Sequence, residues 1–123
     1  MWTYSQSTGA LSAPDGTVAG EGYSGHPPHV NDPNAQSIPD VGPIPQGGYT
    51  IGPFFTDPEK GPLAAHLYPD TGNEMFGRDG FMIHGDSILH LGERVASHGC
   101  IIMAHDVRLA VRQSGDNRLL VTV

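Results

Sequence analysis

Hydrophobic residues in this chain occur in short alternating runs, and each run ends at a cluster of Gly, Pro, Asn or Asp. In the first run, residues 2–6, polar and apolar residues alternate, which predicts a strand with Trp2 and Tyr4 on one face. A second run, residues 18–23, follows the turn signal Ala13-Pro14-Asp15-Gly16. We therefore expect these two runs to form a hairpin.

The middle and the end of the chain continue this pattern of short strands and turns. Residues 26–46 are rich in Pro and Asn, which predicts a long surface loop of the kind that often carries function. Residues 88–91 form a brief strand or a loop, and the apolar residues 101–103 are expected to be buried. Further strands are expected in four runs rich in β-forming residues, namely residues 49–51, 63–68, 81–84 and 119–123.

One segment alone has the character of a helix. Asp106 suits an N-cap and Gly115 lies just beyond the expected end, so the pattern predicts a helix over residues 107–113. The side chains expected to face the core are Val107, Ala110 and Val111. The whole pattern shows neither repeat nor linker, and it indicates a mainly β fold with one short helix in a single domain over residues 1–123.

Composition narrows the classes of function. The 123 residues include 17 glycines and 11 prolines, which suits short strands joined by many turns. The formal net charge of −7, with six Lys and Arg, argues against nucleic acid and anionic membrane surfaces as partners. No apolar run approaches the roughly 18 residues needed to span a bilayer, so no membrane insertion is expected. No basic and then apolar leader precedes the domain, so we expect no secretory signal.

Cys100 is the only cysteine in the chain, which excludes an internal disulfide and a thiolate-rich zinc site. A free cysteine is usually a small buried hydrophobic residue, and this alternative stays open. Here Ser97 and His98 are polar, and Gly99 lets the backbone approach a bound group closely. His84 lies sixteen positions earlier, at the end of an apolar run. A thiol, an imidazole and backbone amides are together what a cysteine nucleophile requires.

Two histidines compete for the role of general base. His84 precedes Gly85, whose carbonyl is able to orient the second ring nitrogen as well as a carboxylate would. His98 lies two residues from Cys100, so on a strand the two side chains would share a face. The sequence does not rank the two histidines. Asp86 is a further candidate for the orienting group, although adjacency along the chain proves no contact.

The seven histidines do not define a metal site. His26 and His29 have a spacing that permits chelation, but the prolines between them favour a surface loop. The chain has no His-Glu-x-x-His helix and no ligand triad with convincing spacing. We expect neither a metal ion nor a cofactor.

Two motifs resemble the signature of the L,D-transpeptidases. The first is His84-Gly85 followed, after a spacer, by Ser97-His98-Gly99-Cys100-Ile101. The second is Gly42-Pro43-Ile44-Pro45-Gln46-Gly47-Gly48-Tyr49-Thr50-Ile51, which is similar to an early strand of that catalytic domain. Two more stretches, residues 20–25 and residues 78–86, resemble a narrower branch, the L,D-transpeptidase-like toxins delivered by type VI secretion.

The resemblance implies a fold and a set of catalytic residues. The fold is an L,D-transpeptidase-like β-sandwich or mixed sheet, mostly antiparallel, with one short helix. Cys100 would be the nucleophile, His84 the base, and Gly85 the residue whose carbonyl orients His84. The turn before the cysteine, Ser97, His98 and Gly99, would supply oxyanion donors and support the site.

The resemblance also bears on substrate binding. Many members of the family carry an arginine or another polar residue directly after the Cys-Ile pair, where this chain has Ile102. Arg78 or Arg94 would then have to hold a substrate carboxylate in its place. Tyr23 and Asp86 are the other substrate contacts that we expect.

The implied activity is acyl transfer on peptidoglycan stem tetrapeptides, resolved by hydrolysis, by exchange of a D-amino acid or by cross-linking. The narrower branch implies an antibacterial effector that leaves its producer without a classical signal peptide and acts in the periplasm of a target bacterium. A cognate immunity protein would be its partner besides the stem peptides. Three alternatives stay open: a housekeeping cell-wall L,D-transpeptidase, a non-catalytic peptidoglycan-binding module and a metallopeptidase.

Overall fold

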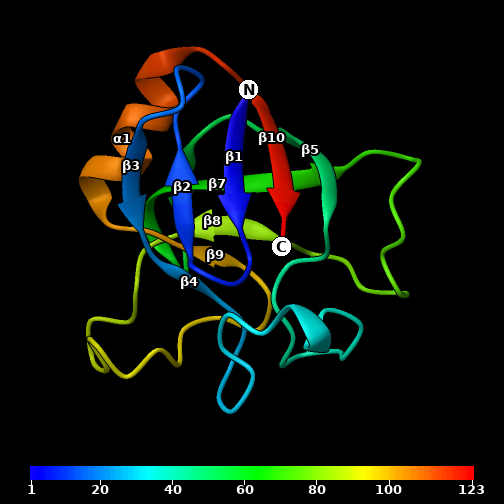
Figure 1. Cartoon of the computed structure of the whole chain (residues 1–123). Helices are drawn as coiled ribbons and strands as arrows, with labels where there is room; N and C mark the ends of the chain where they lie inside the picture. The colour runs from blue at the N-terminus through cyan, green and yellow to red at the C-terminus, as the bar shows by residue number, and fades with distance from the viewer.

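The structure is a computed structural model that describes all residues from 1 to 123. Ten strands form one mixed sheet, accompanied by one α-helix and one short 3₁₀ helix (Figure 1). The helices are η1 (Pro33–Ala35) and α1 (His105–Ser114). The strands are β1 (Trp2–Ser5), β2 (Ala10–Ser12), β3 (Val18–Glu21), β4 (Tyr23–Ser24), β5 (Gly47–Ile51), β6 (Phe55–Asp57), β7 (Gly61–Pro69), β8 (Met82–His84), β9 (Ile101–Ile102) and β10 (Arg118–Thr122).

The sheet nearly closes on itself. Its strand order is β3-β2-β1-β10-β5-β7-β8-β9-β4, and β6 pairs with β7 beside this path. The pairs β1–β10 and β8–β9 are parallel, and the other pairs are antiparallel. The two ends of the order, β3 and β4, are separated along the chain by Gly22 alone, so one chain segment joins both edges of the sheet. This arrangement confirms the expected mainly β, L,D-transpeptidase-like mixed sheet with one short helix.

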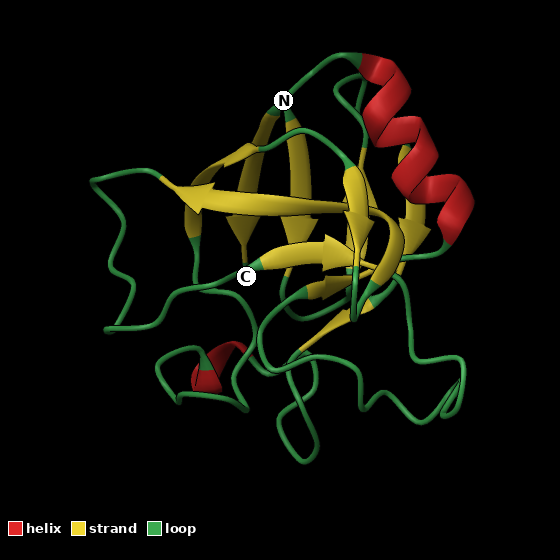
Figure 2. Ribbon diagram, turned by 180° about the vertical axis from the view of Figure 1, so that it is seen from behind, coloured by secondary structure: helices red, strands yellow, loops and turns green.

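The core lies inside this curved sheet. As expected, Trp2 and Tyr4 are buried together on one face of β1. Helix α1 contacts β7 and β3 (Figure 2), and its Val107 and Val111 belong to the same core cluster as Trp2 and Tyr4. On the side of β3, the Val107 side chain lies so close to Gly20 that a Cβ there would come within 2.6 Å of it. The glycine therefore lets the helix approach the sheet closely.

The expected hairpin near the N-terminus is wrong. A short strand that the pattern did not reveal, β2, lies between β1 and β3 and pairs with both. The turn at Ala13–Gly16 exists, with the Gly16 N–H donating to the Ala13 carbonyl, but it joins β2 to β3. A three-residue strand carries too little alternation to be distinguished from a loop. The short strand β6 was missed for the same reason.

The helix also differs in detail from its prediction. It begins at His105 after Ala104, so Asp106 is not the N-cap but lies within the first turn, where its carboxylate accepts the Val107 N–H. Gly115 ends the helix as expected, with a left-handed φ of 71°. Val107 and Val111 are buried, whereas Ala110 is exposed and Arg108 is buried in its place.

Two long loops meet at one end of the sheet. One contains η1 and joins β4 to β5, and the other joins β8 to β9 (cyan and yellow in Figure 1). The His98 ring N–H donates to the Asp40 carbonyl across them, at 2.8 Å. Residues 88–91 belong to the second loop and form no strand. The expected site residues gather where these two loops meet the sheet.

Candidate active site

The parallel pairing of β8 with β9 places His84, the last residue of β8, near the turn in which Cys100 directly precedes β9. His84 is opposite Ile102, and the Met103 N–H donates to the His84 carbonyl at 3.1 Å. Cys100 lies two positions before Ile102, at the end of the turn Ser97–Cys100 and directly before β9. The sheet pairing therefore brings the two expected reactive side chains into one region.

The His84 imidazole is buried, with 1% of the residue exposed. Its Nδ1 lies 2.7 Å from the Gly85 carbonyl oxygen, and because a carbonyl only accepts, Nδ1 carries the proton. Nε2 is buried and has no hydrogen-bond partner. Burial lowers the pKa of His84, and the Gly85 carbonyl opposes this effect. The ring is therefore neutral at pH 7 with a free lone pair on Nε2, which is the state of a general base.

The Cys100 thiol is half-buried. Burial raises the pKa of Cys100, while the nearby backbone of Met82 and the charges of Lys60 and Arg78 oppose this rise. A thiol with a raised pKa is protonated at pH 7, so the site does not hold a preformed thiolate beside a charged imidazole. Chemistry at Cys100 would require transfer of its proton to a base during the attack.

The buried Ser97 hydroxyl shapes the turn before the cysteine. It accepts the Gly25 N–H at 3.0 Å and the Gly99 N–H at 3.1 Å, and it donates to the Cys100 carbonyl at 2.6 Å. The Gly99 amide is therefore occupied and is not a free oxyanion donor, contrary to our expectation. The Cys100 N–H, in contrast, has no acceptor in the protein. The Cys100 N–H is therefore free to donate to an oxyanion that forms beside the thiol.

Gly99 has a conformation and surroundings that admit only glycine. Its φ is 132°, in the region that L side chains rarely adopt. A Cβ on Gly99 would lie 2.6 Å from Arg78 Nη2 and 2.7 Å from the Phe81 ring. On its other side the Ser24 hydroxyl, fully buried, donates to the Gly99 carbonyl at 3.0 Å and accepts the Ile44 N–H. Sequence reasoning missed Ser24, although it lies within the stretch 20–25 that resembles the toxin branch.

Arg78 does not act as the expected anchor for a substrate carboxylate. Its side chain is buried, and Nη1 donates to the carbonyls of Gln36 and Pro43, both at 2.7 Å. Nη2 donates to the carbonyls of Gly42 and His98, at 2.9 and 3.2 Å. These bonds hold the loop between β4 and β5 against the turn before Cys100. Arg94, the alternative, is exposed.

His98 lies on the exposed side of the turn. Its ring stacks on His26, with centroids 4.8 Å apart and an interplanar angle of 5°. Because Ser97–Cys100 is a turn rather than a strand, the expected sharing of a face between His98 and Cys100 does not apply. His84 is the histidine that combines burial, a fixed tautomer and a free ring nitrogen, so the geometry favours it over His98.

Tyr23 and Asp86 bind each other. The Tyr23 hydroxyl donates to Asp86 Oδ1 at 2.6 Å and accepts the Ala96 N–H at 3.1 Å. Asp86 Oδ1 also accepts the Ser87 N–H. Asp86 therefore does not orient His84, whose Nδ1 is bound by Gly85. The buried Tyr23 joins the two ends of the loop between β8 and β9, and burial followed by the Asp86 hydrogen bond raises its pKa.

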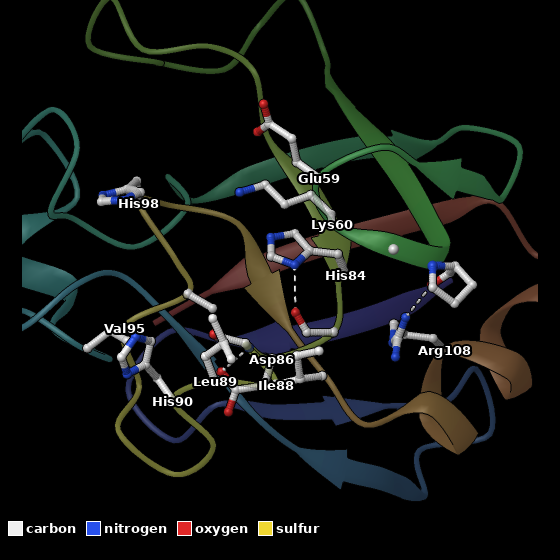
Figure 3. Close-up of a pocket in the computed structure, with 15 residues that line it drawn as sticks. Glu59, Lys60, His84, Asp86, Ile88, Leu89, His90, Val95, His98 and Arg108 are labelled. Atoms are coloured by element: carbon white, nitrogen blue, oxygen red, sulfur yellow. Dashed lines mark hydrogen bonds between the residues drawn. The ribbon is translucent and has the colours of Figure 1, made fainter.

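A cavity of about 670 Å³ opens beside His84 (Figure 3). Cys100 is not part of its lining, whereas Ala96 and His98 are. A second cavity of about 630 Å³ shares Gly85, Asp86 and Arg108 with the first. Two cations that sequence reasoning missed, Lys60 and Arg108, line the first cavity. The lining residues are Glu59, Lys60, Gly61, Pro62, His84, Gly85, Asp86, Ser87, Ile88, Leu89, His90, Val95, Ala96, His98 and Arg108.

No group of three or more His, Cys, Asp or Glu side chains is placed to hold a metal ion. Neither helix combines the length and the apolar character needed to cross a bilayer.

Comparison with solved structures identifies the class of fold. The catalytic domain of an L,D-transpeptidase from E. faecium, solved by NMR, is similar with a TM-score of 0.56 and 20% sequence identity, over 98% of this chain and 95% of that one. The fold is therefore that of an L,D-transpeptidase catalytic domain. The family model of the Tlde1 domain matches residues 19–123. The chain thus belongs to the Tlde1 domain family of type VI secretion L,D-transpeptidase effectors. No curated protein sequence gives a significant match.

Proposed function

We propose that this protein is a cysteine-dependent acyl-transfer enzyme that removes or exchanges the terminal D-amino acid of peptidoglycan stem tetrapeptides. The observation that supports it most is the β8–β9 pairing, which puts a neutral, buried His84 on the strand beside Cys100. Membership of the Tlde1 domain family and the L,D-transpeptidase fold support a peptidoglycan substrate.

In the first half of the proposed reaction, Cys100 Sγ attacks the carbonyl carbon that joins the third residue of the stem to the terminal D-Ala. His84 Nε2 takes the thiol proton as the S–C bond forms, and the Gly85 carbonyl stabilises the resulting imidazolium through Nδ1–H. The Cys100 N–H donates to the developing oxyanion. When the C–N bond breaks, His84 returns the proton to the departing amine, which leaves a thioester on Cys100 and free D-Ala.

In the second half, a nucleophile resolves the thioester. Water yields the tripeptide and completes a carboxypeptidase reaction, whereas a free D-amino acid yields an exchanged tetrapeptide. In either case His84 takes a proton from the nucleophile, the C–S bond breaks, and the proton returns to the thiolate. Hydrolysis removes the terminal D-Ala from the tetrapeptide donors that a growing wall uses for cross-links, and exchange replaces it with another D-amino acid.

We further propose that the protein is an antibacterial effector, exported by type VI secretion and active in the periplasm of a target cell. Support for this comes from its family membership. A producer of such an effector needs an immunity protein, and the long loops around the cavity offer a surface that such a partner could cover.

The test is a mass-spectrometric digest of purified muropeptides, with and without added D-amino acid. The wild type should remove D-Ala from tetrapeptides or replace it, and Cys100→Ala should do neither. His84→Gln should lose the activity and His98→Gln should keep most of it. If folded wild type changes no muropeptide, or if Cys100→Ala retains the activity, the proposed function is wrong.

A further inference from the structure

Arg108 is a buried cation without an ionic partner. It lies on α1 with 7% of the residue exposed, and no carboxylate lies within ion-pair distance of it. Burial lowers the pKa of its guanidinium, and no neighbouring acid opposes the effect. Burying a charge without an ion-pair partner is unfavourable, so backbone carbonyls and not an acid hold the side chain in this place.

Three hydrogen bonds fix the guanidinium and leave one end free. Nε donates to the Met103 carbonyl at 3.1 Å, and Nη1 donates to the carbonyls of Pro62 and Leu63 at 2.9 and 3.0 Å. No group of the protein accepts a hydrogen bond from Nη2. Because the fork of an arginine is planar and rigid, these bonds set the direction of the free N–H groups.

The free end of Arg108 lies beside the candidate base. A Cβ on Gly85 would come within 2.8 Å of Arg108 Nη2, so the glycine leaves the space beside this nitrogen open. The Gly85 carbonyl is the group that orients His84. Arg108 lines both cavities, and Figure 3 shows Arg108 and Lys60 on either side of His84. The charges of both cations also act on His84.

The acids near these cavities do not neutralise Arg108. Asp86 lines both cavities, but its Oδ1 binds the Tyr23 hydroxyl and the Ser87 N–H. Glu59 and Glu21 line one cavity each and make no ion pair. An anion that enters the cavity beside His84 would therefore meet the free N–H groups of Arg108 Nη2, which the other hydrogen bonds of the guanidinium hold in a fixed direction.

We infer that Arg108 Nη2 binds a free carboxylate of the substrate peptide and so selects an acidic stem peptide; this inference rests on the proposed function. It gives the chain a carboxylate anchor that neither Ile102 nor the occupied Arg78 provides. A stem tetrapeptide offers two carboxylates near the scissile bond. One is the terminal carboxylate of the leaving D-Ala, and the other is the distal carboxylate of a diaminopimelate-type third residue.

The experiment measures peptide binding by calorimetry in the Cys100→Ala background, where turnover does not interfere. Three synthetic tetrapeptides are compared: the free acid, a form amidated at the distal carboxylate and a form amidated at the terminus. The parent should bind the acid about 10- to 100-fold more tightly than one of the amides, as expected for a charge-assisted hydrogen bond. The amidated peptide that binds more weakly then identifies the carboxylate that Arg108 binds.

Adding Arg108→Lys should reduce this acid-to-amide ratio to near one, whereas Arg112→Lys, an exposed control on the same helix, should preserve it. If Arg108→Lys does not fold, Gly85→Ala carries the same test, because its Cβ would cover Nη2. The inference is overturned if the parent binds all three peptides equally. It is also overturned if the folded variant weakens every peptide alike and keeps the ratio, because that result marks a purely structural arginine.

The outcomes separate this inference from the proposed function. If the wild type releases D-Ala but the acid-to-amide ratio does not depend on Arg108, the enzyme assignment stands and the anchor is refuted. If no D-Ala is released but the ratio depends on Arg108, the carboxylate site stands and the proposed reaction is refuted.

Discussion

Replacement of Ser97 by alanine should damage both the stability of the fold and the geometry beside Cys100. The Ser97 hydroxyl is fully buried and makes three hydrogen bonds, two of them accepted from the amides of Gly25 and Gly99. Alanine leaves both amides buried without these acceptors, and each unsatisfied donor costs about 1–3 kcal/mol. Because neighbouring terms are not additive, we expect a total loss of about 2–4 kcal/mol in the free energy of unfolding.

Thermal and urea denaturation followed by circular dichroism would measure this loss. For a domain of this size, each kcal/mol corresponds to about 3–6 °C in Tm, so Ser97→Ala should melt roughly 6–24 °C lower than the wild type. The matched control is Ser5→Ala, which removes a hydroxyl that also bonds to the backbone but lies at the surface. A surface substitution of this kind should change stability by no more than about 0.5 kcal/mol.

The same variant tests the shape of the site. At a temperature where both proteins are folded, Ser97→Ala should release D-Ala at least about tenfold more slowly, since a misplaced oxyanion donor alone has such an effect. Equal melting temperatures for Ser97→Ala and Ser5→Ala would refute the stability argument. Full activity in folded Ser97→Ala would show that the turn does not position the Cys100 amide.

Three further predictions concern the loop and the titration of the site. Tyr23→Phe removes the bonds to Asp86 and Ala96, so amide hydrogen exchange in the loop between them should accelerate; unchanged exchange would contradict this. Because burial raises the pKa of Cys100, alkylation by iodoacetamide should have its midpoint at higher pH in the folded than in the unfolded protein, and coincident midpoints would contradict this. Burial lowers the pKa of His84 below 6.5, so in acid the unfolded chain binds more protons than the folded chain. The free energy of unfolding should therefore fall as the pH drops below about 6.5. His84→Gln should make this fall less steep, and an equally steep fall in the variant would count against the prediction.

Elements with a local signal could be predicted from the sequence. Trp2 and Tyr4 alternate over a whole strand, and Gly115 ends the helix in the left-handed conformation that glycine favours. The elements that were predicted wrongly are those whose local sequence signal is weak. Strand β2 is three residues long, and the helix begins at His105, one residue before Asp106, after the N-cap Ala104, which provides no side-chain cap.

The candidate site depended on two kinds of information. Its motifs singled out His84 and Cys100, and the structure places His84 at the end of β8 and Cys100 directly before the neighbouring strand β9. Their catalytic roles stay predictions. No pattern within the sequence reveals that the Ser97 hydroxyl occupies the Gly99 amide, because these bonds depend on the exact path of the turn.

The contacts of the two buried arginines, Arg78 and Arg108, could not be predicted either, because they join residues that are far apart in the sequence. Arg78 binds carbonyls from 20 to 42 positions away in sequence, and such contacts exist only once the sheet has formed. Arg108 follows Val107 and precedes Val111 by three positions, so it borders the apolar stripe of the helix. That position signals a partly buried side chain, but not that its free end lies beside His84.

The central claim is that Cys100 forms a thioester with the stem peptide, and intact-protein mass spectrometry tests it most directly. Wild type mixed with a tetrapeptide and quenched in acid should gain the mass of the tetrapeptide less D-Ala, and digestion should locate the adduct on Cys100. His84→Gln should form the adduct far more slowly, and Cys100→Ala should form none. Release of D-Ala by Cys100→Ala, or an adduct on any other residue, would contradict the account.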